Sequence, residues 1–119
     1  MSKYFSPNEN GLDEGRFEKL QPELLEKLDE LRELYGKPIH ITSSYRSPEH
    51  PIEARKEKPG EHTFGAAVDI GAVGGYDAFM LVNFAMRVGF TRIGVSRKNS
   101  FIHLGIGYPG APEVTLWTY

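Results

Sequence analysis

The chain has 119 residues, of which 39% are apolar and 12% aromatic, so it is long enough for one compact domain and too short for two. Its 14 basic and 16 acidic residues give a net charge of −2, which offers no electrostatic attraction to nucleic acid or anionic membranes and favours neutral or small partners. Because the sequence has no cysteine, disulfides and thiolate zinc sites are excluded, and any metal must be held by imidazole and carboxylate groups.

Residues 1–16 are rich in Ser, Pro, Asn, Gly and charge, which predicts an extended arm that packs on the domain through Tyr4 and Phe5. This segment lacks the apolar core of a signal peptide, and no run in the chain approaches the roughly 20 apolar residues that cross a bilayer. We expect no membrane span. The sequence leaves the localisation of the protein open.

Residues 21–35 are predicted to form the first helix, which ends at the Gly-Lys-Pro run that follows. Its buried stripe at helical spacing is Leu24, Leu28, Leu31 and Leu34 or Tyr35. Ile39 and Ile41 then alternate with polar residues, which indicates a half-buried strand. The segment 48–60 carries three prolines and six charged residues and is expected to be a long surface loop or a short helix flanked by loops.

The second half of the chain alternates between strand and helix patterns. Residues 66–70 form a predicted strand, and residues 76–88 form a strongly apolar and therefore largely buried helix that ends at Gly89. Three further short strands are expected at 92–95, 101–106 and 114–117. This order predicts a single α+β domain in which helices pack on one face of a small antiparallel sheet.

Three polar residues interrupt the apolar pattern. In the strand at 101–106 the even positions are aliphatic, so His103 must point away from the core, and Asp69 does the same between two aliphatic neighbours. A buried aspartate costs roughly several kcal/mol unless it is hydrogen-bonded or coordinates a cation. His62 precedes Asp69 by seven residues, with small residues between them. If these side chains converge, they form a two-histidine, one-carboxylate site with an open position, as expected for catalytic zinc.

Simpler explanations exist for each residue taken alone. A single histidine in a strand is usually a structural residue with satisfied hydrogen bonds. Asp69 could cap a turn or pair with an arginine. Because these residues are scattered along the chain, unlike the two histidines of an HExxH motif, spacing by itself leaves the metal hypothesis open.

Three ordered blocks of the sequence resemble the M15 family of zinc D-Ala-D-Ala peptidases, and most closely its short phage-type and carboxypeptidase members. The blocks are ITSSYRSPEH at 41–50, EHTFGAAVDI at 61–70, and FIHL at 101–104. The second block follows the family pattern SxHxxGxAxD from its histidine onward. The similarity covers nearly the whole chain, and it implies a Hedgehog/DD-peptidase-like fold.

The resemblance also implies roles for individual residues. His62, Asp69 and His103 correspond to the ligands of one Zn²⁺ per chain, and Arg46 corresponds to the residue that faces the substrate. A guanidinium suits a carboxylate or a developing oxyanion, although a structural ion pair that anchors the loop is the alternative for Arg46. The other residues expected to line this cleft are Ser43 and Tyr45.

The chain departs from the family pattern at three positions. Many members carry Glu or Asp three residues before the last histidine as the general base, where this chain has Ser100, whose hydroxyl cannot accept a proton at neutral pH. Glu61 replaces the small residue before the first histidine and is a candidate base if its backbone is not extended. Gly105 stands where short members often have Asp. Other candidates for the base are His50, which could also contact substrate, Asp77 and Glu113.

The resemblance predicts a monomeric enzyme, such as a phage endolysin, that hydrolyses a peptide bond in peptidoglycan stem peptides. It would act as a D-Ala-D-Ala carboxypeptidase or as an L-Ala-D-Glu endopeptidase. The alternative is a non-catalytic zinc-containing domain of a virion or of a wall-binding protein, which the serine at position 100 supports and the retained Arg46 opposes. A metal-free interaction domain would leave Asp69 without a charge partner.

Overall fold

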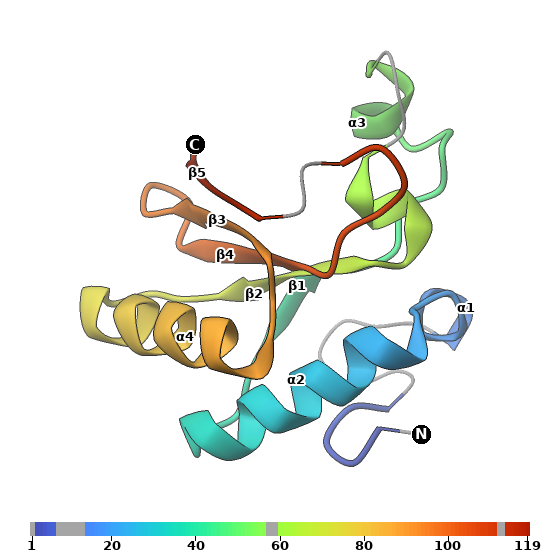
Figure 1. Cartoon of the computed structure of the whole chain (residues 1–119). Helices are drawn as coiled ribbons and strands as arrows, with labels where there is room; N and C mark the ends of the chain where they lie inside the picture. Colours follow the sequence, from blue (N-terminus) through green and yellow to red (C-terminus); the bar gives the residue numbers. More distant parts are fainter. Residues whose placement is uncertain (1, 7–13, 57–59, 112–113) are drawn as a thin grey trace.

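The computed structural model describes residues 2–6, 14–56, 60–111 and 114–119 (Figure 1). Its helices are α1 (Glu14–Glu18), α2 (Pro22–Tyr35), α3 (Pro51–Ala54), the 3₁₀ helix η1 (Glu61–Phe64) and α4 (Gly75–Val88). Its strands are β1 (Ile41–Ser43), β2 (Ala67–Gly71), β3 (Arg92–Ser96), β4 (Phe101–Gly105) and β5 (Thr115–Thr118). Figure 1 shows α2 and α4 on one face of the sheet, so the predicted α+β arrangement is confirmed. None of the described helices is long and apolar enough to cross a membrane.

The five strands form one sheet in the order β1-β2-β4-β3-β5. The pairs β1–β2, β2–β4 and β3–β4 are antiparallel, but β5 runs parallel to β3. The prediction of a wholly antiparallel sheet is therefore wrong at this edge. The reason is that β4 ends beside the start of β3, so a strand that begins at this end on the other edge of β3 runs in the same direction as β3.

The core lies between the sheet and α2. The predicted leucine stripe is confirmed at Leu24, Leu28 and Leu31, each of which is fully buried, whereas Leu34 is 46% exposed. Tyr35, the predicted alternative to Leu34 at the last turn of the helix, packs on the core instead. The sheet contributes the aliphatic residues of β2 and β4, namely Val68, Ile70, Ile102 and Leu104. Burying each large aliphatic side chain stabilises the folded state by about 1.5 to 3 kcal/mol. This apolar layer therefore determines which face of the sheet packs on the helices and which face points away from them.

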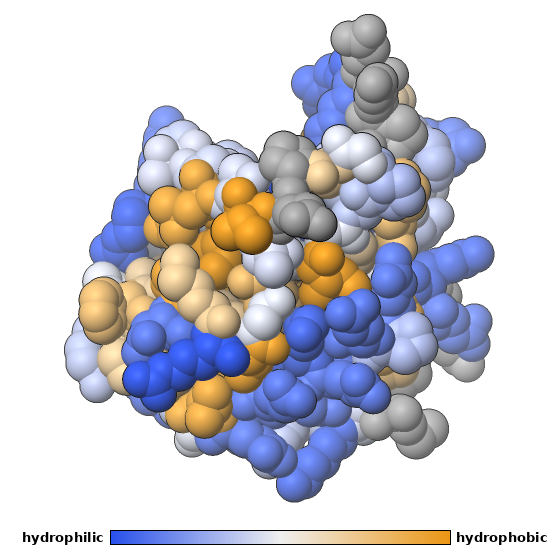
Figure 2. Space-filling view, in the orientation of Figure 1, coloured by the Kyte–Doolittle hydropathy of each residue, from blue (hydrophilic) through white to orange (hydrophobic). Residues whose placement is uncertain are grey.

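Helix α4 ends at Gly89, whose φ of 101° confirms the predicted glycine cap. The prediction that this helix is largely buried is wrong, because only Ala78, Leu81 and Ala85 are buried. Its outer apolar residues are Tyr76, Phe79 and Met86, all more than half exposed. The sheet and α2 cover one side of α4, and the described residues place no further layer outside it. Figure 2 shows apolar side chains at the surface of this part of the molecule, so the composition overstated the burial of α4.

The described part of the N-terminal segment packs on α2. Phe5 is 3% exposed within the core, and Tyr4 packs against it, as predicted. The backbone N–H groups of Lys3 and Tyr4 donate to the Asp29 carboxylate at 2.8 and 3.0 Å. Helix α1 begins at Glu14, so the last three residues of the predicted extended arm are helical instead. Residues 7–13 of that arm lie outside the described residues.

The turn that follows η1 is fixed against the start of α2. Gly65 has a φ of 64°, and its carbonyl accepts a hydrogen bond from the Gln21 N–H at 2.9 Å. A Cβ atom on Gly65 would overlap the backbone carbonyl of Lys19. Position 65 therefore requires glycine for its left-handed conformation and for its space, and this turn determines where η1 lies.

We expect Gly65→Ala to lower the free energy of unfolding by more than about 2 kcal/mol, because about 1 to 2 kcal/mol of left-handed strain adds to a backbone overlap. Gly36→Ala is the matched control, since Gly36 has a φ of 76° but open space around its Cα. The Gly36→Ala variant should therefore be destabilised by the left-handed strain alone. Urea unfolding of both variants tests the comparison, and equal losses would show that the contact with Lys19 contributes nothing.

Candidate metal centre

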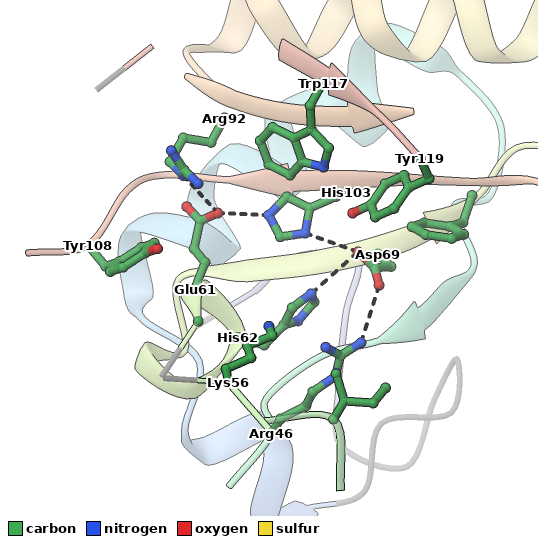
Figure 3. A pocket seen from close by; sticks show the side chains of 13 residues that line it. Arg46, Lys56, Glu61, His62, Asp69, Arg92, His103, Tyr108, Trp117 and Tyr119 are labelled. Atoms are coloured by element: carbon green, nitrogen blue, oxygen red, sulfur yellow. Dashed lines mark hydrogen bonds and ion pairs between the residues drawn. The ribbon is translucent and has the colours of Figure 1, made fainter. Parts of the chain in front are cut away.

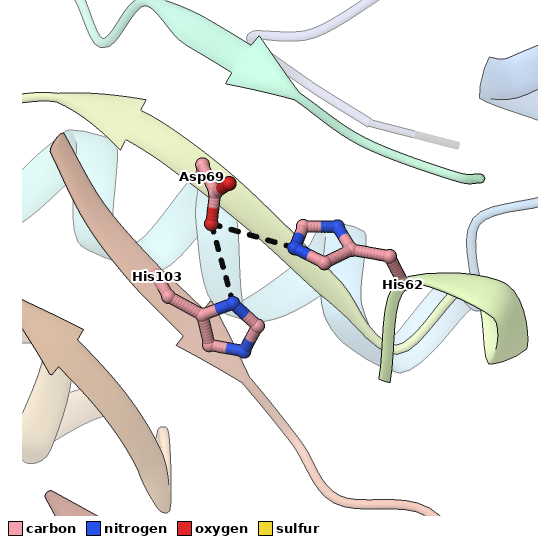
Figure 4. Close-up of side chains that lie close together, drawn as sticks. All are labelled: His62, Asp69 and His103. Atoms are coloured by element: carbon pink, nitrogen blue, oxygen red, sulfur yellow. Dashed lines mark ion pairs between the residues drawn. The ribbon is translucent and has the colours of Figure 1, made fainter. Parts of the chain in front are cut away.

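Asp69 and His103 lie side by side on the sheet face that points away from α2 and α4. The register of β2 and β4 pairs them directly, and the aliphatic residues on either side of each face the core. His62 reaches the same point from η1, the short helix that precedes β2 (Figure 4). The alternation in the two strands therefore places the carboxylate and one imidazole as predicted, and the η1 turn adds the second imidazole.

The three side chains come within the range of one shared ion. Oδ1 of Asp69 lies 3.4 Å from Nε2 of His62 and 3.2 Å from Nδ1 of His103. One ligand atom from each residue lies within 4.8 Å of the other two, and all three residues are buried. Two ligands of a tetrahedral zinc ion, each at about 2.1 Å, are about 3.4 Å apart. The spacing of the carboxylate oxygen from each imidazole therefore fits zinc.

Hydrogen bonds on the far side of each ring fix its orientation and its tautomer. Nδ1 of His62 lies 2.7 Å from the carbonyl oxygen of Ser44, which can only accept, so this nitrogen carries the proton. Nε2 of His103 lies 2.7 Å from Oε1 of Glu61, to which it donates. The nitrogen with the lone pair, Nε2 of His62 and Nδ1 of His103, therefore faces Asp69 in each ring.

The environment of Asp69 favours its charged form. Oδ1 is buried and has no hydrogen-bond partner among the described residues. Burial alone raises the pKa of Asp69, but its interactions with His103 and His62 outweigh burial and hold the pKa far below its usual value. Burial likewise lowers the pKa of His103, while the Asp69 and Glu61 carboxylates raise it to a net value above 6.5. A buried anion between two imidazole nitrogens is a cation site by its chemistry.

Glu61 lies at the edge of this cluster, because it is the first residue of η1 and its backbone is not extended. Its Oε1 also accepts from Nε of Arg92 at 3.1 Å, and its Oε2 accepts from the Gly107 N–H at 2.7 Å. Burial raises the pKa of Glu61, but the hydrogen bonds from His103 and Gly107 and the charge of Arg92 lower it overall. Both oxygens of this carboxylate are therefore engaged, and Figure 3 shows the contacts with Arg92 and His103.

Arg46 reaches the centre from the loop after β1. Its guanidinium donates to Oε2 of Glu53 at 3.1 Å and to Oγ of Ser43 at 3.2 Å, and it lies 3.7 Å from Oδ2 of Asp69. Glu53 is 3% exposed and also binds Lys56 and the Gly60 N–H. Burial raises the pKa of Glu53, but these partners lower it below 4.5. Glu53 therefore holds both Arg46 and the segment that follows α3.

The centre opens into a pocket of about 550 Å³ (Figure 3). Besides the three clustered residues, its lining includes the cationic side chains of Arg46, Lys56 and Arg92. The aromatic part of the wall is formed by Phe101, Tyr108, Trp117 and Tyr119. The site is thus accessible from one side, and that side combines positive charge with aromatic surface.

The indole of Trp117 packs on the metal centre because its strand neighbour has no side chain. The Trp117 and His103 rings lie 5.0 Å apart between centroids, and a Cβ on Gly94 would overlap the indole. The strand register places Gly94 between these two residues. The pairing of β5 with β3, which brings Trp117 to this position, could not be derived from the sequence.

Several other residues singled out in the sequence lie away from the centre. Ser100 lies in the turn between β3 and β4 with a φ of 55°, outside the residues that line the pocket. Tyr45 packs on the core, and the His50 side chain caps α3. Asp77 pairs with Lys37 at 3.0 Å near the start of α4. Glu113 lies outside the described residues.

Two functional features were missed in the sequence. Glu53 was part of a charged segment with no periodicity, and nothing in the sequence distinguished it from its exposed neighbours. Arg92 was assigned only to a strand, although its position directly opposite Gly105 brings it to Glu61. Both residues become identifiable only once the long-range pairing of strands and loops is known.

Comparisons with known proteins agree with this geometry. The profile of the family described as Peptidase M15 matches residues 1–105, a segment that includes the three clustered residues and Arg46 and ends with β4. Strand β5, which carries Trp117, and the residue Tyr119 that follows it lie beyond the match. A comparison with curated proteins finds no match. From the profile match and the cluster that it includes, we conclude that the chain belongs to the Peptidase M15 family of zinc peptidases.

Proposed function

We propose that the chain is a zinc-dependent peptidase that hydrolyses a peptide bond in peptidoglycan stem peptides. The observation that carries the proposal is the convergence of His62, Asp69 and His103, with the coordinating nitrogen of each ring held toward Asp69. Zinc bound there would lower the pKa of a water ligand toward about 7 and polarise the scissile carbonyl. Three protein ligands beside an open pocket are typical of catalytic zinc, whereas structural zinc has a closed shell of four.

The charge of the pocket supports an acidic peptide as the substrate. Arg46, Lys56 and Arg92 line it, and Arg46 lies beside Asp69 with its guanidinium partly exposed to the pocket. A guanidinium binds a carboxylate through two parallel hydrogen bonds. Stem peptides offer such groups, since a carboxypeptidase would hold the terminal D-Ala carboxylate and an L-Ala-D-Glu endopeptidase would hold another acidic group. The aromatic wall offers apolar surface to the rest of the peptide.

One observation favours a non-catalytic alternative, a zinc-containing wall-binding or virion domain. Ser100, at the position of the usual base, lies in a turn outside the pocket lining. Among the described residues that line the pocket, the carboxylates are Asp69 and Glu61, and Glu61 has both oxygens engaged. The alternative shares the zinc site with the main proposal and differs from it only in chemistry.

We expect the purified protein to bind about one zinc ion per chain and His103→Ala to abolish this binding, because the change removes one of three ligands. His40→Ala is the matched control, since His40 is exposed and lies away from the centre. Metal analysis after dialysis measures the stoichiometry. A wild-type chain without zinc would overturn the metallopeptidase proposal.

The same samples test the substrate. Incubation of the zinc-loaded protein with purified muropeptides, followed by mass spectrometry, should show loss of D-Ala or cleavage after L-Ala, and a chelator should suppress it. Zinc binding without cleavage of any muropeptide would favour the non-catalytic alternative.

Arg46→Lys should lower kcat/KM on a muropeptide by roughly 30-fold, which corresponds to about 2 kcal/mol, because lysine keeps the charge but loses the planar fork of donors. Zinc content should remain that of the wild type. Arg55→Lys, at an exposed position on the end of α3, is the control and should leave kcat/KM unchanged. An unchanged rate for Arg46→Lys would show that this residue only anchors its loop.

The depressed pKa of Glu53 predicts a pH-dependent contribution to stability. A group whose folded pKa lies below its unfolded value of 4.5 stabilises the fold above that pH, and the contribution disappears as the pH falls through the lower folded pKa. Glu53→Gln should therefore lower the free energy of unfolding by at least about 1 kcal/mol at pH 7, and the difference from wild type should close as the pH falls through the folded pKa of Glu53. Urea unfolding across this range, with the exposed Glu49→Gln as control, measures the effect. A gap that is constant with pH would contradict the assignment.

A further inference from the structure

The Glu61 carboxylate is buried and held in place by three hydrogen-bond donors. Its side chain is 3% exposed. Oε1 accepts from Nε2 of His103 at 2.7 Å and from Nε of Arg92 at 3.1 Å, and Oε2 accepts from the N–H of Gly107 at 2.7 Å. Three donors on three different segments of the chain hold this carboxylate in one position, and one of these donors is the ring of a metal-ligand candidate.

Gly105 provides the space in which this carboxylate lies. Position 105 follows His103 by two residues in β4, so a side chain there would point to the same face of the sheet. A Cβ atom on Gly105 would overlap the carboxyl carbon and both oxygens of Glu61. Gly105 does not adopt a positive φ, so its backbone does not demand glycine. The absence of a side chain at this position is explained by the presence of Glu61.

We propose that Glu61 is the positioning residue of the metal centre, and that Glu61 and Gly105 act as one coupled pair which delivers a carboxylate to His103 from η1 instead of from β4. This inference rests on the proposed function only in that His103 is taken as a zinc ligand. Through its hydrogen bond to Nε2, Glu61 holds the ring so that Nδ1 faces Asp69. A carboxylate beyond a ligating imidazole sets the tautomer and raises the basicity of the ligand.

The register of the sheet implies that a carboxylate could reach His103 either from η1, as Glu61 does, or from position 105 of β4. Position 105 lies directly opposite Arg92, so an aspartate there would face the same guanidinium that Glu61 now binds. It would also lie on the same strand face as the His103 ring. Exchanging the pair, by Glu61→Ser together with Gly105→Asp, should therefore restore a carboxylate near Nε2 of His103.

The first experiment measures zinc affinity by competition with a chromophoric chelator, which requires no substrate. Glu61→Ala should bind zinc about 10- to 100-fold more weakly than wild type, and Glu61→Gln, which conserves the volume, should lie between them. The exchanged double variant should recover affinity to within about tenfold of wild type. Wild-type affinity in Glu61→Ala, or a double variant no better than Glu61→Ser alone, would overturn the proposal.

The second experiment tests the coupling and the tautomer directly. Gly105→Ala should strongly lower the free energy of unfolding in the wild type but lower it much less in the Glu61→Ala background, because the overlapping carboxylate is then absent. Urea unfolding measures both losses, and equal losses would contradict the coupled pair. In ¹⁵N NMR of the zinc-loaded protein, the Nε2–H of His103 should be protected from exchange in wild type and lose this protection in Glu61→Ala while the backbone amides of the core keep theirs, whereas general destabilisation would lower the protection of both.

The outcomes separate this inference from the proposed function. Tight zinc binding that depends on Glu61, without cleavage of any muropeptide, would leave the positioning role intact and remove the peptidase assignment. Cleavage of muropeptides with unchanged zinc affinity in Glu61→Ala would do the reverse. A wild-type protein that binds no zinc would overturn both.

Discussion

The arrangement of the site depends on one buried anion. The Asp69 carboxylate projects from β2 on the sheet face opposite the helices, and its Oδ1 lies between nitrogens of His62 and His103 without a hydrogen-bond donor among the described residues. The hydrophobic layer against α2 forces it there, because a shift of one residue in the β2–β4 register would place the carboxylate in the core. Core packing and metal chemistry are therefore set by the same alternation of side chains.

The groups around the three clustered residues matter as much as the residues themselves. The Ser44 carbonyl and the Glu61 carboxylate each accept a hydrogen bond from the N–H of one imidazole, and Glu53 holds Arg46 beside Asp69. Two glycines make room for these contacts, since Gly105 leaves space for Glu61 and Gly94 leaves space for Trp117. Small residues in the sheet thus shape the pocket as directly as the charged residues that line it.

Much of this could be predicted from the sequence where the signal was local. The leucine stripe of α2 and the outward direction of Asp69 and His103 follow from periodicities of 3.6 and 2, the glycine caps after α2 and α4 follow from the left-handed conformation at helix ends, and all were confirmed. Features that depend on long-range pairing were missed or wrong. The parallel β5, the buried Glu53, and the place of Gly105 beside Glu61 depend on segments that meet only in the folded chain.

The central claim is that one zinc ion is held by Nε2 of His62, Nδ1 of His103 and a carboxylate oxygen of Asp69, with its remaining side open to the pocket. Anomalous diffraction at the zinc absorption edge, from crystals grown with zinc, tests this most directly. We expect a single strong peak about 2.0 to 2.2 Å from these three atoms. A peak at another place, coordination through the other nitrogen of either ring, or a fourth protein ligand that closes the shell would contradict it.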